Sequence, residues 1–279
     1  MRPAGTIYPG QLKLRVVADG TGRTRTAVLQ QRYPQRMTAS LHCDELFPDA
    51  AVVCVQSPSG GTFSDDDLET TVSAGPGTHL RLTTQAASQV FAGPGSGASH
   101  RLSFRIEAGG ILEYLPKTLI PHAGSRYSQL IEIDLDATGC YLGWDALAAG
   151  RLGHGERFAY GSYDSSLRLS VDGRTVARDR QRLEPPSAAR LLGADYLATF
   201  LAVAPTADCA ALVSRIRQAL NDLPATIRTG AGELPDSAGI LVRMTTDSAP
   251  DLRRAQALVL DEVRDQLLIR TRPRAEHTL

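Results

Sequence analysis

Carboxylates are the side chains of this sequence whose spacing first suggests chemistry. Asp65, Asp66 and Asp67 are adjacent, and carboxylate oxygens suit Mg²⁺ or Ca²⁺. Neighbouring side chains on a strand point to opposite faces, so three in a row do not converge easily on one ion. Because exposed turns favour Asp, we interpret this group as a solvated turn.

The histidines and cysteines lack the spacing of a metal site. Six histidines contain no His-x-His or His-x-x-x-His pair, and four cysteines contain no Cys-x-x-Cys pair. His42 and Cys43 are adjacent ligands that suit Ni²⁺ or Zn²⁺, and His154 lies near Glu156. Two residues do not make a closed site. We therefore expect no tightly bound metal and at most transient binding at these four positions.

Two further polar groups each have a structural and a functional interpretation. Arg151 and Glu156 are five residues apart, which predicts an ion pair that pins a loop; desolvating such a pair is costly, so it often marks a specific geometry. Thr83, Thr84 and Gln85 follow an apolar run. Their side chains either satisfy backbone groups at a strand end or line a cavity or channel, and the sequence leaves both open.

Motifs for nucleotides and nucleophiles are missing. The Gly-rich segments at residues 59–61 and 93–97 lack the spacing of a P-loop or a dinucleotide fingerprint. Ser88 lacks a Gly-x-Ser-x-Gly elbow. The enzyme alternative is a β-rich hydrolase that uses Asp65, Asp67 or Glu156 in acid–base chemistry.

Composition limits the partners. The 279 residues carry 30 basic and 30 acidic side chains, so the formal net charge is zero, whereas nucleic-acid binding needs a basic field. No run approaches the ~20 apolar residues of a membrane span. The first ten residues, MRPAGTIYPG, lack the apolar core of a signal peptide. We expect a cytoplasmic protein with no nucleic-acid or membrane partner.

Short runs between turn signals predict β structure over most of the chain; most alternate apolar with polar residues, and the run at 51–56 is apolar and rich in valine. The predicted strands cover residues 11–18, 51–56, 78–83, 99–107, 128–134 and 167–171. Asp172-Gly173 predicts a type I′ hairpin. The close spacing of the strands favours packed antiparallel sheets over βαβ units.

The last part of the chain predicts helix–strand–helix. Thr206 is expected to cap a helix over residues 207–220. Residues 239–245 are expected to form a buried strand, and Ser248 is expected to start a second helix. This amphipathic helix, over residues 251–268, is expected to help form a partner surface. No linker is evident, so we expect one domain over residues 1–279, with a β-rich part at 10–205 and this tail at 206–270.

Five segments, in this order, resemble the UreD (UreH) family of urease accessory proteins. They are Gly60-Gly61, LTTQAAS at 82–88, GGILEYLP at 109–116, a strand with an acidic end at 131–135, and GRLGHGERF at 150–158. One departure is Phe63-Ser64 before the three aspartates, where the family commonly has a glycine.

The resemblance implies a mainly β fold of stacked, β-helix-like sheets with two α-helices near the C-terminus. It implies a protein that is not an enzyme, binds urease apoprotein and UreF, reaches the GTPase UreG through UreF, and assists GTP-dependent nickel delivery as a conduit for transient Ni²⁺. A scaffold that bridges partners without touching metal is the alternative. A transit path should bind the ion weakly, because each stop must also release it. By position, the candidates for the path or a partner interface are Thr83, Thr84, Gln85, Glu113, Asp134, Arg151 and Glu156.

Overall fold

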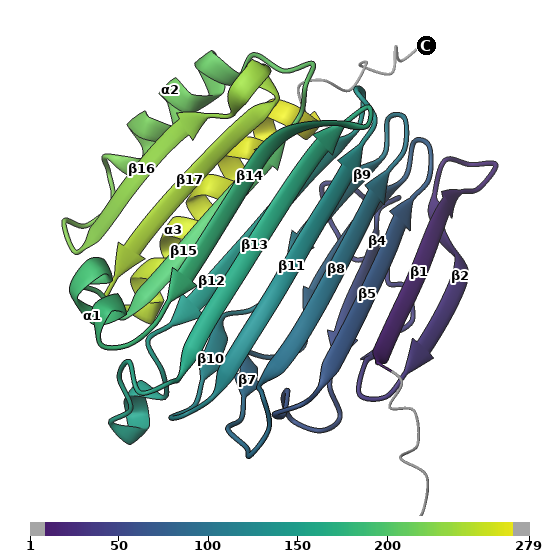
Figure 1. Cartoon of the computed structure of the whole chain (residues 1–279). Coiled ribbons are helices and arrows are strands. Elements are labelled where there is room, and N and C mark those ends of the chain that lie inside the picture. Colours follow the sequence, from purple (N-terminus) through teal and green to yellow (C-terminus); the bar gives the residue numbers. More distant parts are fainter. Residues whose placement is uncertain (1–8, 270–279) are drawn as a thin grey trace, which may run out of the picture.

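Two β-sheets lie face to face in the computed structural model, which describes residues 9–269 (Figure 1). The predicted domain bounds of 1 and 279 therefore lie outside the described residues. Sheet A has the strand order β14-β13-β11-β8-β5-β1-β2, and sheet B has the path β16-β17-β15-β12-β9-β6-β4-β3 with β7 and β10 beside it.

The strands of sheet A are β1 (Gly10–Ala18), β2 (Thr24–Arg32), β5 (Asp67–Ala74), β8 (Ala98–Ile106), β11 (Arg126–Leu135), β13 (Ser162–Val171) and β14 (Arg174–Leu183). Those of sheet B are β3 (Arg36–Met37), β4 (Ala51–Gln56), β6 (His79–Thr84), β7 (Ser88–Val90), β9 (Ile111–Leu115), β10 (Leu119–Pro121), β12 (Cys140–Ala148), β15 (Tyr196–Val203), β16 (Ile227–Glu233) and β17 (Gly239–Thr246). The helices are α1 (Ser187–Leu192), α2 (Cys209–Leu220) and α3 (Ala249–Arg264), with short helical turns η1 (Leu152–His154), η2 (Pro235–Ser237) and η3 (Asp265–Ile269).

The prediction of antiparallel sheets is wrong for the centre of both sheets. β5, β8, β11 and β13 pair in parallel, as do β4, β6, β9 and β12. The reason is that successive main strands alternate between sheet A and sheet B, so each turn of the coil returns to the same sheet in the same direction. The mainly β, stacked and β-helix-like fold that the resemblance implies is confirmed.

Local signals predicted many elements well. β4 has the predicted bounds, and the Asp172-Gly173 hairpin is confirmed, with φ of 48° and 74° as a type I′ turn requires. Ser248 caps α3 by accepting a hydrogen bond from Asp251 N. The cap of α2 is Asp208 rather than Thr206, because Asp208 Oδ1 accepts from Ala211 N and the helix begins at Cys209. The short helix α1 was not predicted.

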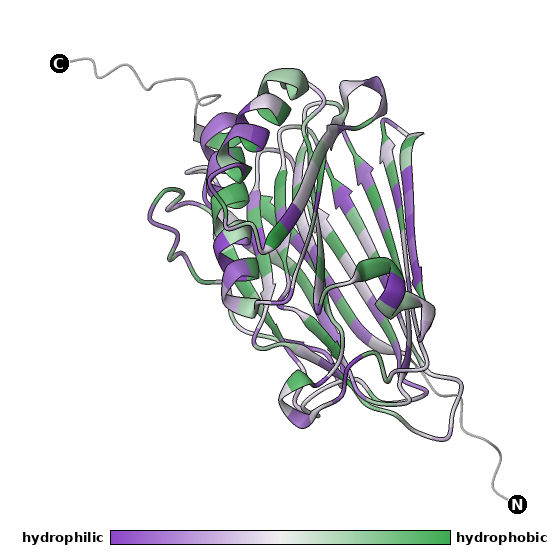
Figure 2. Cartoon of the chain, turned by 90° about the vertical axis from the view of Figure 1, so that its left-hand side faces the viewer, coloured by the Kyte–Doolittle hydropathy of each residue, from purple (hydrophilic) through white to green (hydrophobic). Residues whose placement is uncertain are grey.

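Apolar side chains fill two layers. One lies between the sheets and includes Val72, Leu82 and Phe104. The other lies between sheet B and the helices α2 and α3, which form a layer on one side of the sheets (Figure 2). The apolar stripe of α3 is buried there and packs against sheet B. Within residues 9–269, no helix is long and apolar enough to cross a membrane.

Candidate functional site

A row of polar side chains crosses the space between the sheets, where most of the core is apolar. In sheet A, the register places Gln129 of β11 beside Ser165 of β13, and Ser165 beside Gln181 of β14. In sheet B, it places Asp145 of β12 beside Thr199 of β15. We call these five residues the interior polar layer.

Asp145 is the centre of this layer because sheet A directs three hydrogen bonds at its carboxylate. Its Oδ2 accepts from Gln129 Nε2 at 2.9 Å, from Tyr163 OH at 3.0 Å and from Ser165 Oγ at 3.1 Å. Beside it, Gln181 Nε2 donates to Thr199 Oγ1 at 2.9 Å. The layer therefore joins the two sheets through polar contacts.

The surroundings of Asp145 favour its protonated form. Burial raises the pKa of Asp145, and the hydrogen bonds from Tyr163, Ser165 and Gln129 lower it by less. All three donors are neutral, and no ion pair to Asp145 occurs in the described part of the chain. A cation that reached this carboxylate would compete with a proton for it.

A small cavity borders Asp145. Its volume is about 30 Å³, and its lining includes Ser165, Asp179, Gln181 and Thr199. That is roughly the volume of one water molecule. The cavity is large enough for water or a single ion and too small for an organic substrate.

Hydrogen bonds continue from the layer across sheet A. Tyr127 OH lies 3.5 Å from Gln129 Oε1 and 3.4 Å from His100 Nδ1, and His100 Nε2 lies 2.9 Å from Thr70 Oγ1. Burial lowers the pKa of His100 to about 4, despite the smaller opposing effect of Asp67. His100 is thus neutral at neutral pH, and polar side chains from five strands of sheet A, β5, β8, β11, β13 and β14, line the interior.

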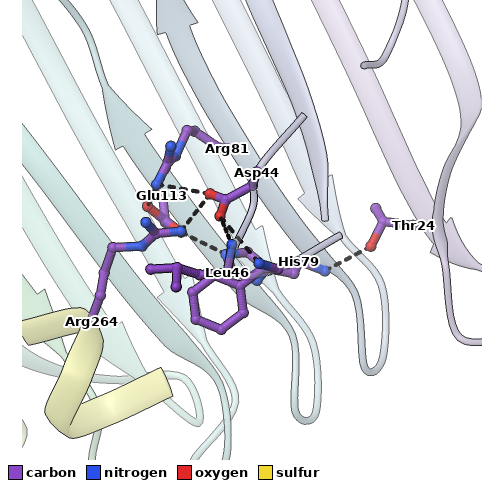
Figure 3. Close-up of polar contacts among 8 residues, drawn as sticks. Thr24, Asp44, Leu46, His79, Arg81, Glu113 and Arg264 are labelled. Atoms are coloured by element: carbon purple, nitrogen blue, oxygen red, sulfur yellow. Dashed lines mark hydrogen bonds and ion pairs between the residues drawn. The ribbon is translucent and has the colours of Figure 1, made fainter. Parts of the chain in front are cut away.

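A second buried polar group holds Glu113 on the helical side of sheet B (Figure 3). Its carboxylate contacts His79 Nε2 at 2.6 Å, Arg81 at 3.0 Å and Arg264 of α3 at 3.3 Å. Asp44 contacts Arg264 at 2.5 Å and Arg81 at 3.2 Å. We call these five residues the ion cluster; it joins α3, β6, β9 and the segment before β4.

The ion cluster keeps Glu113 ionised, although the residue is 0% exposed. Burial would raise the pKa of Glu113, but the hydrogen bond from His79 and the charges of His79, Arg81 and Arg264 outweigh it and lower the pKa. The ring of Phe47 covers the guanidinium of Arg264 at 4.7 Å. Two arginines balance the two carboxylates, which makes this a structural contact rather than a free cation site.

Thr83 and Gln85 lie outside the interior, in a groove on the helical side of sheet B. The groove has a volume of about 700 Å³ and runs between the ends of β6 and β9 and one flank of α3. Thr83 Oγ1 donates to Leu115 O at 2.7 Å, and Thr84 Oγ1 accepts from Lys117 N at 2.9 Å. Both threonines therefore satisfy backbone groups, and Gln85 is exposed.

The predicted ion pair between Arg151 and Glu156 is confirmed. Two nitrogens of Arg151 contact the two carboxylate oxygens of Glu156, which also accepts from Ala123 N at 3.0 Å. The hydrogen bond from Arg151 lowers the pKa of Glu156 to about 2. The pair pins the loop after β12, and its side chains are 34% and 18% exposed, so it is not deeply buried.

The remaining predicted site residues lie apart from one another. Asp134 is on the outer face of sheet A, 3.3 Å from Arg105. His42 contacts the carbonyl of Ala50 at 3.0 Å, and Cys43 and His154 are exposed. Within residues 9–269, no three His, Cys, Asp or Glu residues are grouped so that they could hold a metal ion.

The three adjacent aspartates form the expected turn. Asp65 Oδ1 accepts from Ser96 N at 2.9 Å, Asp66 Oδ2 from Phe63 N at 2.7 Å, and Asp67 Oδ1 from Ser99 Oγ at 2.6 Å. The carboxylates serve separate partners.

Sequence reasoning missed Asp145, which among the described residues 9–269 is the one carboxylate in the interior without an ion pair. A signal was present, because Asp145 is the one charged residue in the run CYLGWDALAA at 140–149. A lone charge in a buried strand is costly and often marks function. Its partners Gln129, Tyr163 and Ser165 come from other strands, so their convergence required the register.

Comparisons with known proteins agree with the resemblance. The family model "UreD urease accessory protein" matches residues 8–277. The chain is 55% identical to the urease accessory protein UreD of Mycolicibacterium gilvum over 95% of this chain and 97% of that protein. It is 32% identical to UreD 2 of Streptomyces griseus, over 98% and 95%, and 31% identical to UreD of Haloarcula marismortui, over 92% and 86%. This chain, with its two stacked sheets and its helical layer, belongs to the UreD family of urease accessory proteins.

Proposed function

We propose that this protein acts in urease maturation as a metallochaperone scaffold in the cytoplasm. It binds urease apoprotein and UreF, reaches UreG through UreF, assists GTP-dependent nickel delivery and passes Ni²⁺ through the interior polar layer. The observation that carries the nickel step is Asp145, a carboxylate between the sheets with neutral partners and a cavity beside it.

The chemistry of the layer suits transit rather than storage. Carboxylate, hydroxyl and amide oxygens bind a divalent ion without the soft thiolate and imidazole set of a closed site. Burial raises the pKa of Asp145, so a proton competes with the ion for this single carboxylate and weakens its hold on the ion. Weak binding of this kind is what conduction requires.

The hydrolase alternative has less support. Acid–base catalysis needs two titratable groups around one reacting position with suitably separated pKa values. Asp65 and Asp67 serve separate turn contacts, and the Arg151 ion pair holds the pKa of Glu156 at about 2. We propose that the chain has no catalytic activity of its own. A scaffold without metal transit is the second candidate, and the ion cluster favours it because it fixes α3 to sheet B.

Asp145→Asn separates the conduit from the scaffold. Asn keeps the shape and an acceptor oxygen while removing the carboxylate. We expect urease activation in cells that co-express the cognate urease and accessory proteins to fall by roughly tenfold or more, with less nickel per urease site and an unchanged melting temperature. Asp134→Asn on the outer face is the matched control. Full activation by Asp145→Asn would leave the scaffold as the function.

For the UreF contact, we propose the groove beside α3. Its lining combines apolar Leu115, Pro116, Ala257 and Leu260 with the cation Arg253, a mixture that suits a protein interface. Ala257→Arg fills the groove and should abolish retention of UreF in a pull-down after co-expression. Ala210→Arg, at an alanine on α2 that is also exposed, is the control. Equal UreF retention by both variants would place the contact elsewhere.

A further inference from the structure

The two sheets end at different positions on one side of the molecule. β14 is the last strand of sheet A, whereas sheet B continues from β15 to β17 and β16 (Figure 1). A notch of about 460 Å³ lies where β14 faces this extension. Its lining has an apolar part, Leu183, Leu192, Leu197 and Met244, and four arginines, Arg180, Arg182, Arg228 and Arg243.

The row that contains Asp145 leads directly to this notch. In sheet B, Asp145 is registered with Thr199, and Thr199 with Arg243 of β17. In sheet A, Ser165 is registered with Gln181 of β14. Gln181 lines both the notch and the cavity at Asp145.

Two polar contacts between the sheets separate the notch from the cavity. Arg243, which lines the notch, forms an ion pair with Asp179, which lines the cavity. Gln181 donates to Thr199 at 2.9 Å beside it. The side chains of Arg243 and Asp179 are 44% and 26% exposed, and an ion pair exposed to this degree adds little stability, so it can open.

We propose that this notch is the mouth of the cavity at Asp145 and that the ion pair between Asp179 and Arg243 is its gate; the passage of nickel through it rests on the proposed function. When Arg243 moves away, Asp179 and Asp145 both face the cavity without a cation, which gives an entering divalent ion two carboxylates. With the gate closed, Arg243 neutralises Asp179 and fills the route.

An alternative interpretation is that the ion pair between Asp179 and Arg243 only closes the edge of the two sheets. Arg180, on the same strand as Asp179, provides a control for this alternative. Arg180 also lines the notch and also has a carboxylate partner, Asp164, but that partner belongs to sheet A. Loss of the Arg180 pair changes the charge of the notch without releasing a contact between the sheets.

Thiol labelling tests the gate without urease or nickel. Leu167→Cys places a thiol on the cavity lining, and methyl methanethiosulfonate is a small neutral probe. Peptide mass spectrometry reads labelling at position 167 separately from the four native cysteines. Adding Arg243→Gln should speed labelling by about twofold to fivefold, the change that follows from losing a contact of up to ~1 kcal/mol. Arg180→Gln should leave the rate unchanged, and Asp179→Arg with Arg243→Asp should restore it.

The outcomes separate the gate from the nickel route. An unchanged labelling rate in Arg243→Gln, or the same acceleration in Arg180→Gln, overturns the gate. Faster labelling that the reversed pair restores supports it. If labelling rises in this way while Arg243→Gln and Asp145→Asn both activate urease normally, the mouth and gate stand and the nickel conduit fails.

Discussion

Replacing Glu113 by Gln tests whether the ion cluster fixes α3 to the sheets. The residue is 0% exposed, and its carboxylate contacts His79, Arg81 and Arg264. The variant leaves the buried Arg264 and the partly exposed Arg81 with Asp44 as their carboxylate. Removing one partner of a buried ion group costs about 3–5 kcal/mol. At about 2–4 °C per kcal/mol for a protein near this size, the melting temperature should fall by roughly 6–20 °C.

Glu132→Gln is the matched control, since it makes the same substitution in an ion pair with Arg168 whose side chains are 29% and 53% exposed. A pair exposed to this degree contributes up to about 1 kcal/mol. Thermal and urea unfolding, followed by circular dichroism, measure both variants. A Glu113→Gln loss no larger than that of the control would refute the structural role of the cluster. Normal stability with reduced urease activation would instead place Glu113 on the nickel path.

The pH dependence of the same variant gives an independent check. The pKa of Glu113 in the folded protein is lowered below its ordinary value of 4.5. The contribution of its carboxylate to the free energy of unfolding is therefore fully present above pH 4.5. It is lost as the pH falls through the lowered folded pKa. Gln does not titrate. The stability difference between the wild type and Glu113→Gln should therefore narrow as the pH is lowered below about 4.5, and a constant difference would contradict this assignment.

Three further outcomes follow from the structure. Glu156→Gln should lower the melting temperature only slightly, because Arg151 can turn to solvent; normal melting with reduced urease activation would give Glu156 a role in transit, and full activation would remove it. The isolated protein should hold well under one equivalent of nickel after desalting, measured by elemental analysis, and a retained equivalent would reveal a ligand set that includes His42, Cys43 or His154. Ser248→Ala should destabilise the protein by about 1 kcal/mol in urea unfolding, because Ser248 caps α3, and an unchanged midpoint would contradict this.

The alternation of side chains predicted where strands lie and failed to predict their direction. β1 follows a period of two that reports only which face of the strand is buried. Direction depends on which sheet the next strand joins, and that choice is made by turns such as the one at residues 75–78. The type I′ hairpin at Asp172-Gly173 was predictable because its geometry is local.

The candidate site was less predictable than the fold because its residues meet through pairing between distant strands. Glu113 stands in a motif segment, yet its role depends on Arg264, about 150 residues away. Thr83 and Thr84 left two interpretations open, and the structure gives their hydroxyls backbone partners. Asp145 carried a usable signal as a lone charge, but nothing in the sequence indicated that Gln129, Tyr163 and Ser165 would surround it.

The coiled path of the chain explains why a polar row crosses an otherwise apolar interior. Neighbouring strands pair in register, in parallel at the centre of each sheet and antiparallel from β12 to β15, so positions at the same height along the strands form a row across the sheet. Polar residues at matching positions on several neighbouring strands therefore form a continuous layer. Shifting a strand by one residue would turn its polar side chain to the opposite face. The arrangement of Asp145, Thr199 and Arg243 in one row thus depends on the register of β12, β15 and β17, which ties the proposed mouth to the same feature that builds the fold.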